Sequence, residues 1–195
     1  WRAGAIISLL VIAASWYNQI IKEVNLFMAV KWIFESGYKF SDKKFARIYS
    51  FYVLETPVPG VSVRGKSFKQ RGWNMNQLIA AMKKESPFLN CNWFVKPIKE
   101  IESVCREEKI FDNVDFSKEI AIHTENSKYS LRRTASLFYA IRCAFAHGGF
   151  SIHKCSKERY YLLENFDAGR IKARLVLKEE TLIKWIEIVE KGTRK

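Results

Sequence analysis

Arg142 and His147 are the two residues of this chain whose types and spacing best suit chemistry on a phosphate group. Apolar residues recur along segment 129–147 at spacings of four, three and seven, which predicts one face of a helix. That face consists of Leu131, Ala135, Phe138 and Phe145. Arg142 falls on the same face and is the only charged residue between Thr134 and Ala146. Because burial of a guanidinium without partners is very costly, this arginine is expected to meet an anion, an acceptor network or a wet cleft.

An arginine and a histidine can together cleave RNA without a metal ion. Attack by the 2′-hydroxyl needs a base for that hydroxyl, an acid for the leaving oxygen and a cation for the phosphorane. Histidine exchanges protons near neutral pH, and arginine offers phosphate oxygens a fixed fork of donors. Residues five apart lie about 140° apart on an ideal helix, so one copy cannot easily direct both at one phosphate. Two copies across a two-fold axis can supply two such pairs to one groove, and we therefore expect a homodimer with neither cofactor nor metal.

Segment 141–149, which reads Ile-Arg-Cys-Ala-Phe-Ala-His-Gly-Gly, resembles the signature of the HEPN superfamily. That signature is Arg-x(4–6)-His near the end of a helix, and the similarity extends over about residues 128–191. The resemblance implies that Arg142 and His147 are catalytic and that Cys143 and Gly148 belong to the supporting motif. It also implies an all-α protein of the HEPN-like helical bundle type.

Many HEPN proteins are toxins or defence nucleases that cut RNA as dimers. The resemblance therefore implies an endoribonuclease of a toxin–antitoxin or antiviral system, which leaves 2′,3′-cyclic phosphate ends. Its partners would be RNA, a second copy, and an antitoxin or other regulatory protein. Cys143 stands where these nucleases usually carry a polar residue, and a thiol is a weak hydrogen-bonding group. The alternative is a catalytically silent HEPN-fold module that binds nucleic acid or protein.

The charge of the chain favours a polyanionic partner. Lys and Arg number 33 against 20 Asp and Glu, which gives a formal net charge of +13. Such a surplus attracts nucleic acid first and an anionic membrane surface second. The predicted nucleic-acid-binding residues are Arg64, Lys66, Lys69, Arg71, Arg132, Arg133, Lys154 and Lys157. Trp73 follows the first four and could stack on a base, although solvated faces and a flexible loop explain these cations equally well.

The elements that must position these residues are expected to form a single domain over 1–195. Residues 1–60 are predicted to be helical, with 3–21 as a buried core helix and not a membrane segment. Residues 61–127 are expected to hold connecting helices at 76–84 and 95–109, a basic loop, and at most one helical turn around Ile120. Residues 128–191 are expected to contain the motif helix, a hairpin of strands 159–165 and 170–177, and a C-terminal helix that begins at Glu179.

The cysteines and the remaining histidines suggest no further site. Cys91, Cys105, Cys143 and Cys155 form no C-x-x-C pair, which favours free thiols in a reducing compartment and hence the cytoplasm. A zinc site from His147, His153 and Cys155 matches no known ligand spacing. His123 and His153 are interpreted as surface residues or as residues whose hydrogen bonds are satisfied.

Overall fold

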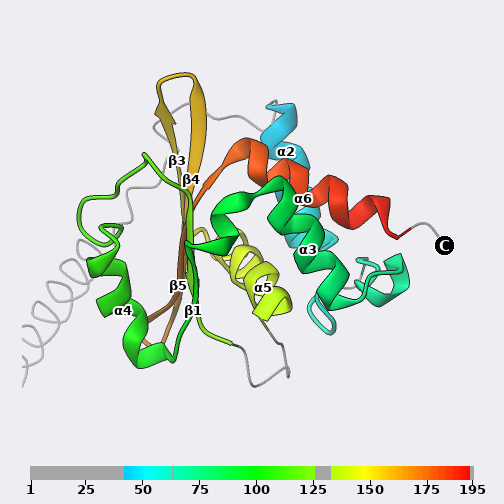
Figure 1. The fold of residues 1–195 in the computed structure, drawn as a ribbon, viewed down its shortest axis with the longest axis horizontal. Helices are drawn as coiled ribbons and strands as arrows, with labels where there is room; N and C mark the ends of the chain where they lie inside the picture. Colours follow the sequence, from blue (N-terminus) through cyan, green and yellow to red (C-terminus); the bar gives the residue numbers. More distant parts are fainter. Residues whose placement is uncertain (1–41, 63, 126–132, 194–195) are drawn as a thin grey trace, which may run out of the picture. The chain divides into compact units, whose positions relative to one another are not determined.

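The computed structural model of this protein describes residues 42–62, 64–125 and 133–193. Five strands form one sheet in the order β1-β2-β5-β4-β3, and Figure 1 shows this sheet edge-on between helices. Their bounds are Trp93–Val95 for β1, Ile120–His123 for β2, Phe150–Cys155 for β3, Glu158–Asp167 for β4 and Arg170–Lys178 for β5. β1 pairs with β2 in parallel, whereas every other neighbouring pair is antiparallel.

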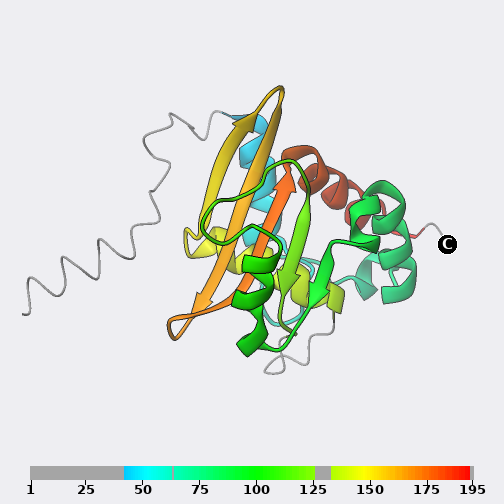
Figure 2. The same cartoon turned by 60° about the vertical axis from the view of Figure 1, so that its left-hand side comes forward.

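Helices cover both faces of this sheet. The longer helices are α2 at Lys43–Tyr49, α3 at Met75–Glu85, α4 at Ile98–Glu107, α5 at Arg133–Ala146 and α6 at Glu179–Lys191. Short helical segments are η2 at Ser50–Leu54, η3 at Lys69–Arg71 and η4 at Pro87–Asn90. α4 contacts β2 and β5 on one face, α5 and α6 contact the sheet on the other, and α2 and α3 pack against α6 (Figure 2).

The local sequence explains where several elements begin and turn. Asp42 caps α2, because its carboxylate accepts from the backbone N–H groups of Lys44 and Phe45 at 3.0 and 3.1 Å. β4 and β5 are joined through Ala168 and Gly169, whose φ angles of 49° and 73° are both left-handed. Two such residues in succession are typical of the tight hairpin turns that match the twist of a sheet.

Each face of the sheet has its own apolar core. The core on the α4 side consists of Ile101, Val104, Cys105, Ile110, Ile120, Ile122, Tyr160, Leu162, Ile171 and Val176. The opposite side is rich in large rings, including Tyr52, Phe138, Phe145, Tyr161 and Trp185, all of them fully buried. Phe138 lies at the centre of this second core, with ring centroids 5.8 Å from Tyr52 and 6.3 Å from Trp185. Aromatic packing therefore holds α5 against η2 and α6, and the Phe145 ring, 6.0 Å from that of Tyr161 in β4, holds it against the sheet.

The prediction of an all-α HEPN-like helical bundle is wrong, because the described residues form a mixed α/β fold around a five-stranded sheet. Strands β4 and β5, their hairpin turn and α6 lie where they were expected. Strands β1 and β3 were not foreseen, and the turn of helix expected around Ile120 is strand β2. β1 and β2 have only three and four residues, and β2 is buried throughout. Such short segments show none of the alternation by which an exposed strand is recognised.

The expected helical segment 1–41, including the apolar stretch 3–21, lies outside the described residues, as does Arg132. Among the residues that the structure describes, no helix has the length and apolar character that a membrane crossing requires.

Candidate functional site

α5 places Arg142 at the rim of its buried face. Phe138 and Phe145 are fully buried, whereas Ala135, Tyr139 and Ala146 are partly exposed. At 100° per residue, Arg142 lies about 40° from Phe138 toward that partly exposed stripe. Arg142 therefore lies on the apolar face that the spacing predicted, at the edge where this face meets the surface.

The guanidinium of Arg142 has unused hydrogen-bonding capacity. Its Nε is buried and has no hydrogen-bond partner among the residues that the structure describes, and none of the ion pairs between those residues includes it. An ion pair between Arg142 and a buried acid would leave the arginine unable to bind a substrate. This part of the structure shows no such ion pair. Because Arg142 is partly exposed and no acid in this part of the chain neutralises its charge, it can bind an anion from outside.

His147 follows the last residue of α5 and is exposed. Its backbone N–H donates to the carbonyl of Cys143 at 3.0 Å, which continues the helical pattern for one more residue. Its ring makes no hydrogen bond with the residues that the structure describes, so it is accessible to a substrate or to a second copy. Cys143 itself is buried, with an exposed fraction of 4%. Its thiol therefore faces the core and not the surface.

Gly148 and Gly149 end α5 for structural reasons. Gly148 has a left-handed φ of 71°, and the Gly149 N–H returns to the carbonyl of Ala144 at 2.8 Å. The Gly149 carbonyl then accepts from the Glu164 N–H of β4 at 2.7 Å. A Cβ atom on Gly149 would lie 2.3 Å from the Glu164 carbonyl oxygen. The two glycines let the chain turn from α5 directly into the sheet, which positions His147 at that corner.

The basic segment 64–71 lies beside α5 and is held in place from several sides. Phe68 is buried, and its ring centroid lies 5.2 Å from that of Phe138, one helical turn before Arg142. The indole N–H of Trp73 donates to the carbonyl of Val189 in α6 at 3.2 Å. This bond makes Trp73 a structural residue, which weakens its expected part in base stacking.

The four cations of this segment have no acidic partner in the part of the chain that the structure describes. Arg64, Lys66 and Lys69 are exposed, and the Nε–H of the half-buried Arg71 donates to the Lys66 carbonyl at 3.1 Å. None of the four forms an ion pair with the residues that the structure describes. Cations without acidic partners suit a polyanion, because no ion pair has to be broken when it binds.

The other predicted nucleic-acid contacts are scattered. The Arg133 guanidinium lies 4.2 Å from the ring centre of Trp93 and donates to the Trp93 carbonyl at 3.2 Å, so it holds α5 against β1. Lys154 is exposed on β3, and Lys157 is exposed in the turn between β3 and β4. The structure therefore brings 64–71 near α5 and places Lys154 and Lys157 elsewhere, toward the start of α6.

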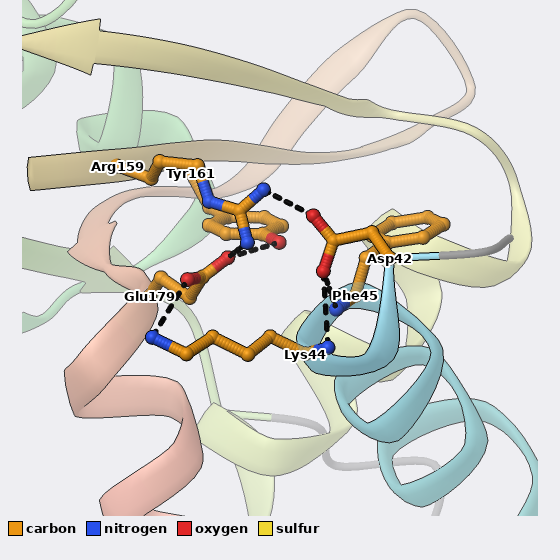
Figure 3. A network of polar contacts seen from close by, with 6 residues as sticks. All are labelled: Asp42, Lys44, Phe45, Arg159, Tyr161 and Glu179. Atoms are coloured by element: carbon orange, nitrogen blue, oxygen red, sulfur yellow. Dashed lines mark hydrogen bonds and ion pairs between the residues drawn. The ribbon is translucent and has the colours of Figure 1, made fainter. Parts of the chain in front are cut away.

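A polar network at the start of α2 and α6 escaped the sequence analysis. Arg159 of β4 pairs with both Asp42 and Glu179, and Glu179 also accepts from the Tyr161 hydroxyl at 3.3 Å (Figure 3). The hydrogen bond from Arg159 lowers the pKa of Asp42 to about 2. No sequence motif links these residues, because they come from separate segments that only the fold brings together.

A cavity of about 440 Å³ adjoins this network. Its lining consists of Lys44, Lys157, Glu158, Arg159, Lys178, Glu179 and Glu180. Of these residues only Lys157 had been predicted to contact a ligand. Four cationic groups facing three acidic ones make the cavity polar, with an excess of one positive charge.

His123 and His153 form hydrogen bonds with other residues, and neither is bonded to Arg142 or His147. His153 is half-buried, with its Nε2 atom 2.8 Å from the Ser151 hydroxyl and its ring centroid 4.4 Å from that of Phe116. His123 is fully buried: the Trp93 indole donates to its Nε2 at 2.9 Å, and its Nδ1 lies 3.1 Å from the Thr124 carbonyl. These contacts assign the proton of the neutral ring to Nδ1, and the expectation that His123 is satisfied is confirmed. Among the described residues, no cluster of His, Cys, Asp or Glu is arranged to hold a metal ion.

Burial lowers the pKa of His123 to about 4, which predicts a loss of stability in acid. The unfolded value is about 6.5, so the folded chain binds fewer protons and its stability declines as pH falls from 6.5 toward 4. The expected loss is about 3 kcal/mol in the free energy of unfolding, measured by urea denaturation across this range. His123→Gln should flatten that decline, whereas His147→Ala, which removes an exposed ring, should keep it. An unchanged decline in His123→Gln would contradict the assignment.

No protein family model, no curated protein and no solved structure matches this chain.

Proposed function

We propose that this protein is a metal-independent endoribonuclease in which Arg142 and His147 act on the scissile phosphate. The observation that carries the proposal is Arg142, which is partly exposed on α5 and forms no ion pair with the residues that the structure describes. Arginine in that state can bind the equatorial oxygens of a pentacovalent phosphate. His147, exposed five residues later at the helix end, is free to exchange protons with the substrate.

The proposed reaction is transfer of the phosphate to the neighbouring 2′-hydroxyl. A neutral His147 takes the 2′-hydroxyl proton as the oxygen attacks phosphorus. A protonated His147 gives a proton to the 5′-oxygen as its bond to phosphorus breaks, which leaves a 2′,3′-cyclic phosphate. Because the two roles need opposite protonation states at once, two histidines are required. Two copies of the chain supply them, and the exposure of His147 leaves it accessible to a second copy.

The basic segment 64–71 is the proposed track for the RNA backbone. Its cations make no ion pairs with the described residues, and Phe68 fixes the segment on Phe138 of the same helix that carries Arg142. Arg142 is four residues beyond Phe138, a rise of about 6 Å along α5. An RNA bound along 64–71 would therefore pass close to the proposed catalytic arginine.

A second candidate function is a binding module without catalysis. Two observations favour it: Cys143 is buried, and the Gly148–Gly149 pair is accounted for by the turn into β3. Part of the resemblance to the HEPN motif therefore has a structural explanation that does not involve RNA cleavage. In this reading the cations bind RNA or an acidic protein, and Arg142 contributes only to affinity.

Incubation of single-stranded RNA with the purified protein in EDTA tests the proposal. We expect cleavage, with 2′,3′-cyclic phosphate ends detected by their resistance to polyadenylation until a phosphatase that opens them is added. A homodimer should be visible by sedimentation at the concentrations that support cleavage. RNA that is retained by the protein but stays intact would favour the binding module.

The basic segment predicts a specific salt dependence of RNA affinity. The logarithm of the association constant falls as the logarithm of the salt concentration rises, with a slope of about −0.7 for each phosphate contact on single-stranded RNA. The double variant Lys66→Ala/Lys69→Ala should therefore make this slope less negative by about 1.4. Fluorescence anisotropy with a labelled oligonucleotide between low and moderate salt measures the slope. Lys83→Ala/Lys84→Ala, on α3, removes the same charge and serves as the control. Equal slopes for the two double variants would exclude 64–71 as the track.

A further inference from the structure

We propose that the cavity at the start of α6 is a binding site for a phosphate group. The inference does not depend on cleavage at Arg142, because it is carried by a different part of the fold. The cavity has about 440 Å³, which suffices for a phosphate and part of the molecule that carries it. Four segments contribute its cations: Lys44 from α2, Lys157 from the β3–β4 turn, Arg159 from β4, and Lys178 from the end of β5.

The acids of the cavity are engaged by partners, which reduces their opposition to an anion. Glu179 is held by Arg159, Lys44 and Tyr161 (Figure 3). Glu158 accepts from Lys178 at 2.8 Å and from the Tyr160 hydroxyl at 3.1 Å. Glu180 pairs at 3.3 Å with Lys184, which is not part of the lining. Each of the three carboxylates is therefore paired with a cation, which reduces its repulsion of an anionic ligand.

Two of the cations remain able to turn toward a ligand. Lys157 is exposed and forms no ion pair with the residues that the structure describes. Lys44 is 68% exposed, and its nitrogen is 3.5 Å from Glu179, a loose contact that a phosphate oxygen can replace. Arg159 differs from these lysines, because its ion pairs with Asp42 and Glu179 hold its guanidinium in one position at the edge of the cavity.

The start of α6 adds backbone donors to these side chains. Lys178 is the N-cap residue and its side chain makes no capping hydrogen bond. The Lys178 N–H is occupied by the Glu119 carboxylate at 2.8 Å, and Glu179 and Glu180, the first two residues of α6, line the cavity. N–H groups of a first helical turn have no partner within the helix and favour anions.

Binding of inorganic phosphate and pyrophosphate, followed by two-dimensional NMR of the whole chain, tests this site. We expect shifts of the Lys157 and Glu180 amides that saturate. Lys157→Ala should weaken binding by about threefold to tenfold, and Glu180→Gln should strengthen it by a similar factor, since each changes one charge near the ligand. Lys99→Ala, which removes an exposed cation of α4 on the opposite face of the sheet, is the matched control and should change nothing.

The source of the phosphate is distinguished by two oligonucleotides that differ only at their ends. Tighter binding of a 5′-phosphorylated RNA than of its 5′-hydroxyl counterpart, lost in Lys157→Ala, would identify an RNA end as the ligand. Equal binding of the two, together with saturable binding of pyrophosphate, would identify a small phosphorylated molecule. The proposal is overturned if phosphate and pyrophosphate shift no amide of the cavity, or if Lys157→Ala and Glu180→Gln change affinity in the same direction.

Discussion

His147→Ala should lower the rate of RNA cleavage by a factor of about 10² to 10⁴, the usual contribution of a general acid or base. Arg142→Ala should have an effect of similar size, because it removes the cation proposed to stabilise the phosphorane. Arg142→Lys keeps the charge but loses the fork of donors, and we expect it to retain only part of the activity. Initial rates of cleavage of a fluorogenic oligonucleotide in EDTA measure all three.

The same variants should leave the fold intact, which separates a catalytic from a structural effect. His147 is exposed, so its removal costs little stability. Arg142→Ala removes a buried Nε that has no hydrogen-bond partner among the described residues, and its free energy of unfolding should be unchanged or higher by up to about 1 kcal/mol. Lys154→Ala, an exposed cation outside the motif, should retain wild-type cleavage. Wild-type rates in both Arg142→Ala and His147→Ala would end the nuclease proposal.

A cellular assay extends this test to the proposed biological setting. If the protein belongs to a toxin–antitoxin or antiviral system, its overproduction should arrest growth through RNA cleavage, and His147→Ala should relieve the arrest. The relief must occur at equal protein levels, as measured by immunoblotting. Growth arrest that persists in His147→Ala would favour the binding module, whose effect needs only affinity.

Gly149→Ala should lower the free energy of unfolding by about 3 kcal/mol. The added Cβ would stand 2.3 Å from the Glu164 carbonyl oxygen, and that atom belongs to the backbone of β4. Neither the strand nor the end of α5 can move without breaking the hydrogen bond between the Glu164 N–H and the Gly149 carbonyl. Urea denaturation followed by circular dichroism measures the change.

Gly169→Ala is the matched control for this effect. Gly169 has a left-handed φ of 73°, but a Cβ there would meet no atom within 4 Å. Its replacement should therefore cost only the backbone strain of about 1 kcal/mol. If Gly149→Ala is as mild as Gly169→Ala, the close approach of the α5 corner to β4 is wrong, and with it the structural explanation of the two glycines.

Local signals in the sequence were sufficient for the C-terminal third. Strands β4 and β5 alternate and flank a left-handed turn at Ala168 and Gly169, and α6 begins with acids and is followed by Gly192. These features act within a few residues, so they can be read without knowing the fold. The strands β1, β2 and β3 depend on neighbours far along the chain. β2, for example, has only four residues, and its pairing with β1 and β5 makes it a strand.

For the candidate sites too, some features could be predicted from the sequence and others required the tertiary structure. The sequence determined that an arginine and a histidine stand five residues apart near a glycine-terminated helix end, and that the chain carries a large positive charge. Only the tertiary structure decided that Arg142 lies at the rim of the core, that Cys143 is buried, and that Lys44, Lys157, Arg159 and Lys178 surround one cavity. The spacing of two residues along a helix fixes the angle between their side chains. Whether a side chain is buried, and which residues of other elements lie near it, depends on the elements that pack against that helix. That packing is set by long-range burial of apolar area, which no short window of sequence contains.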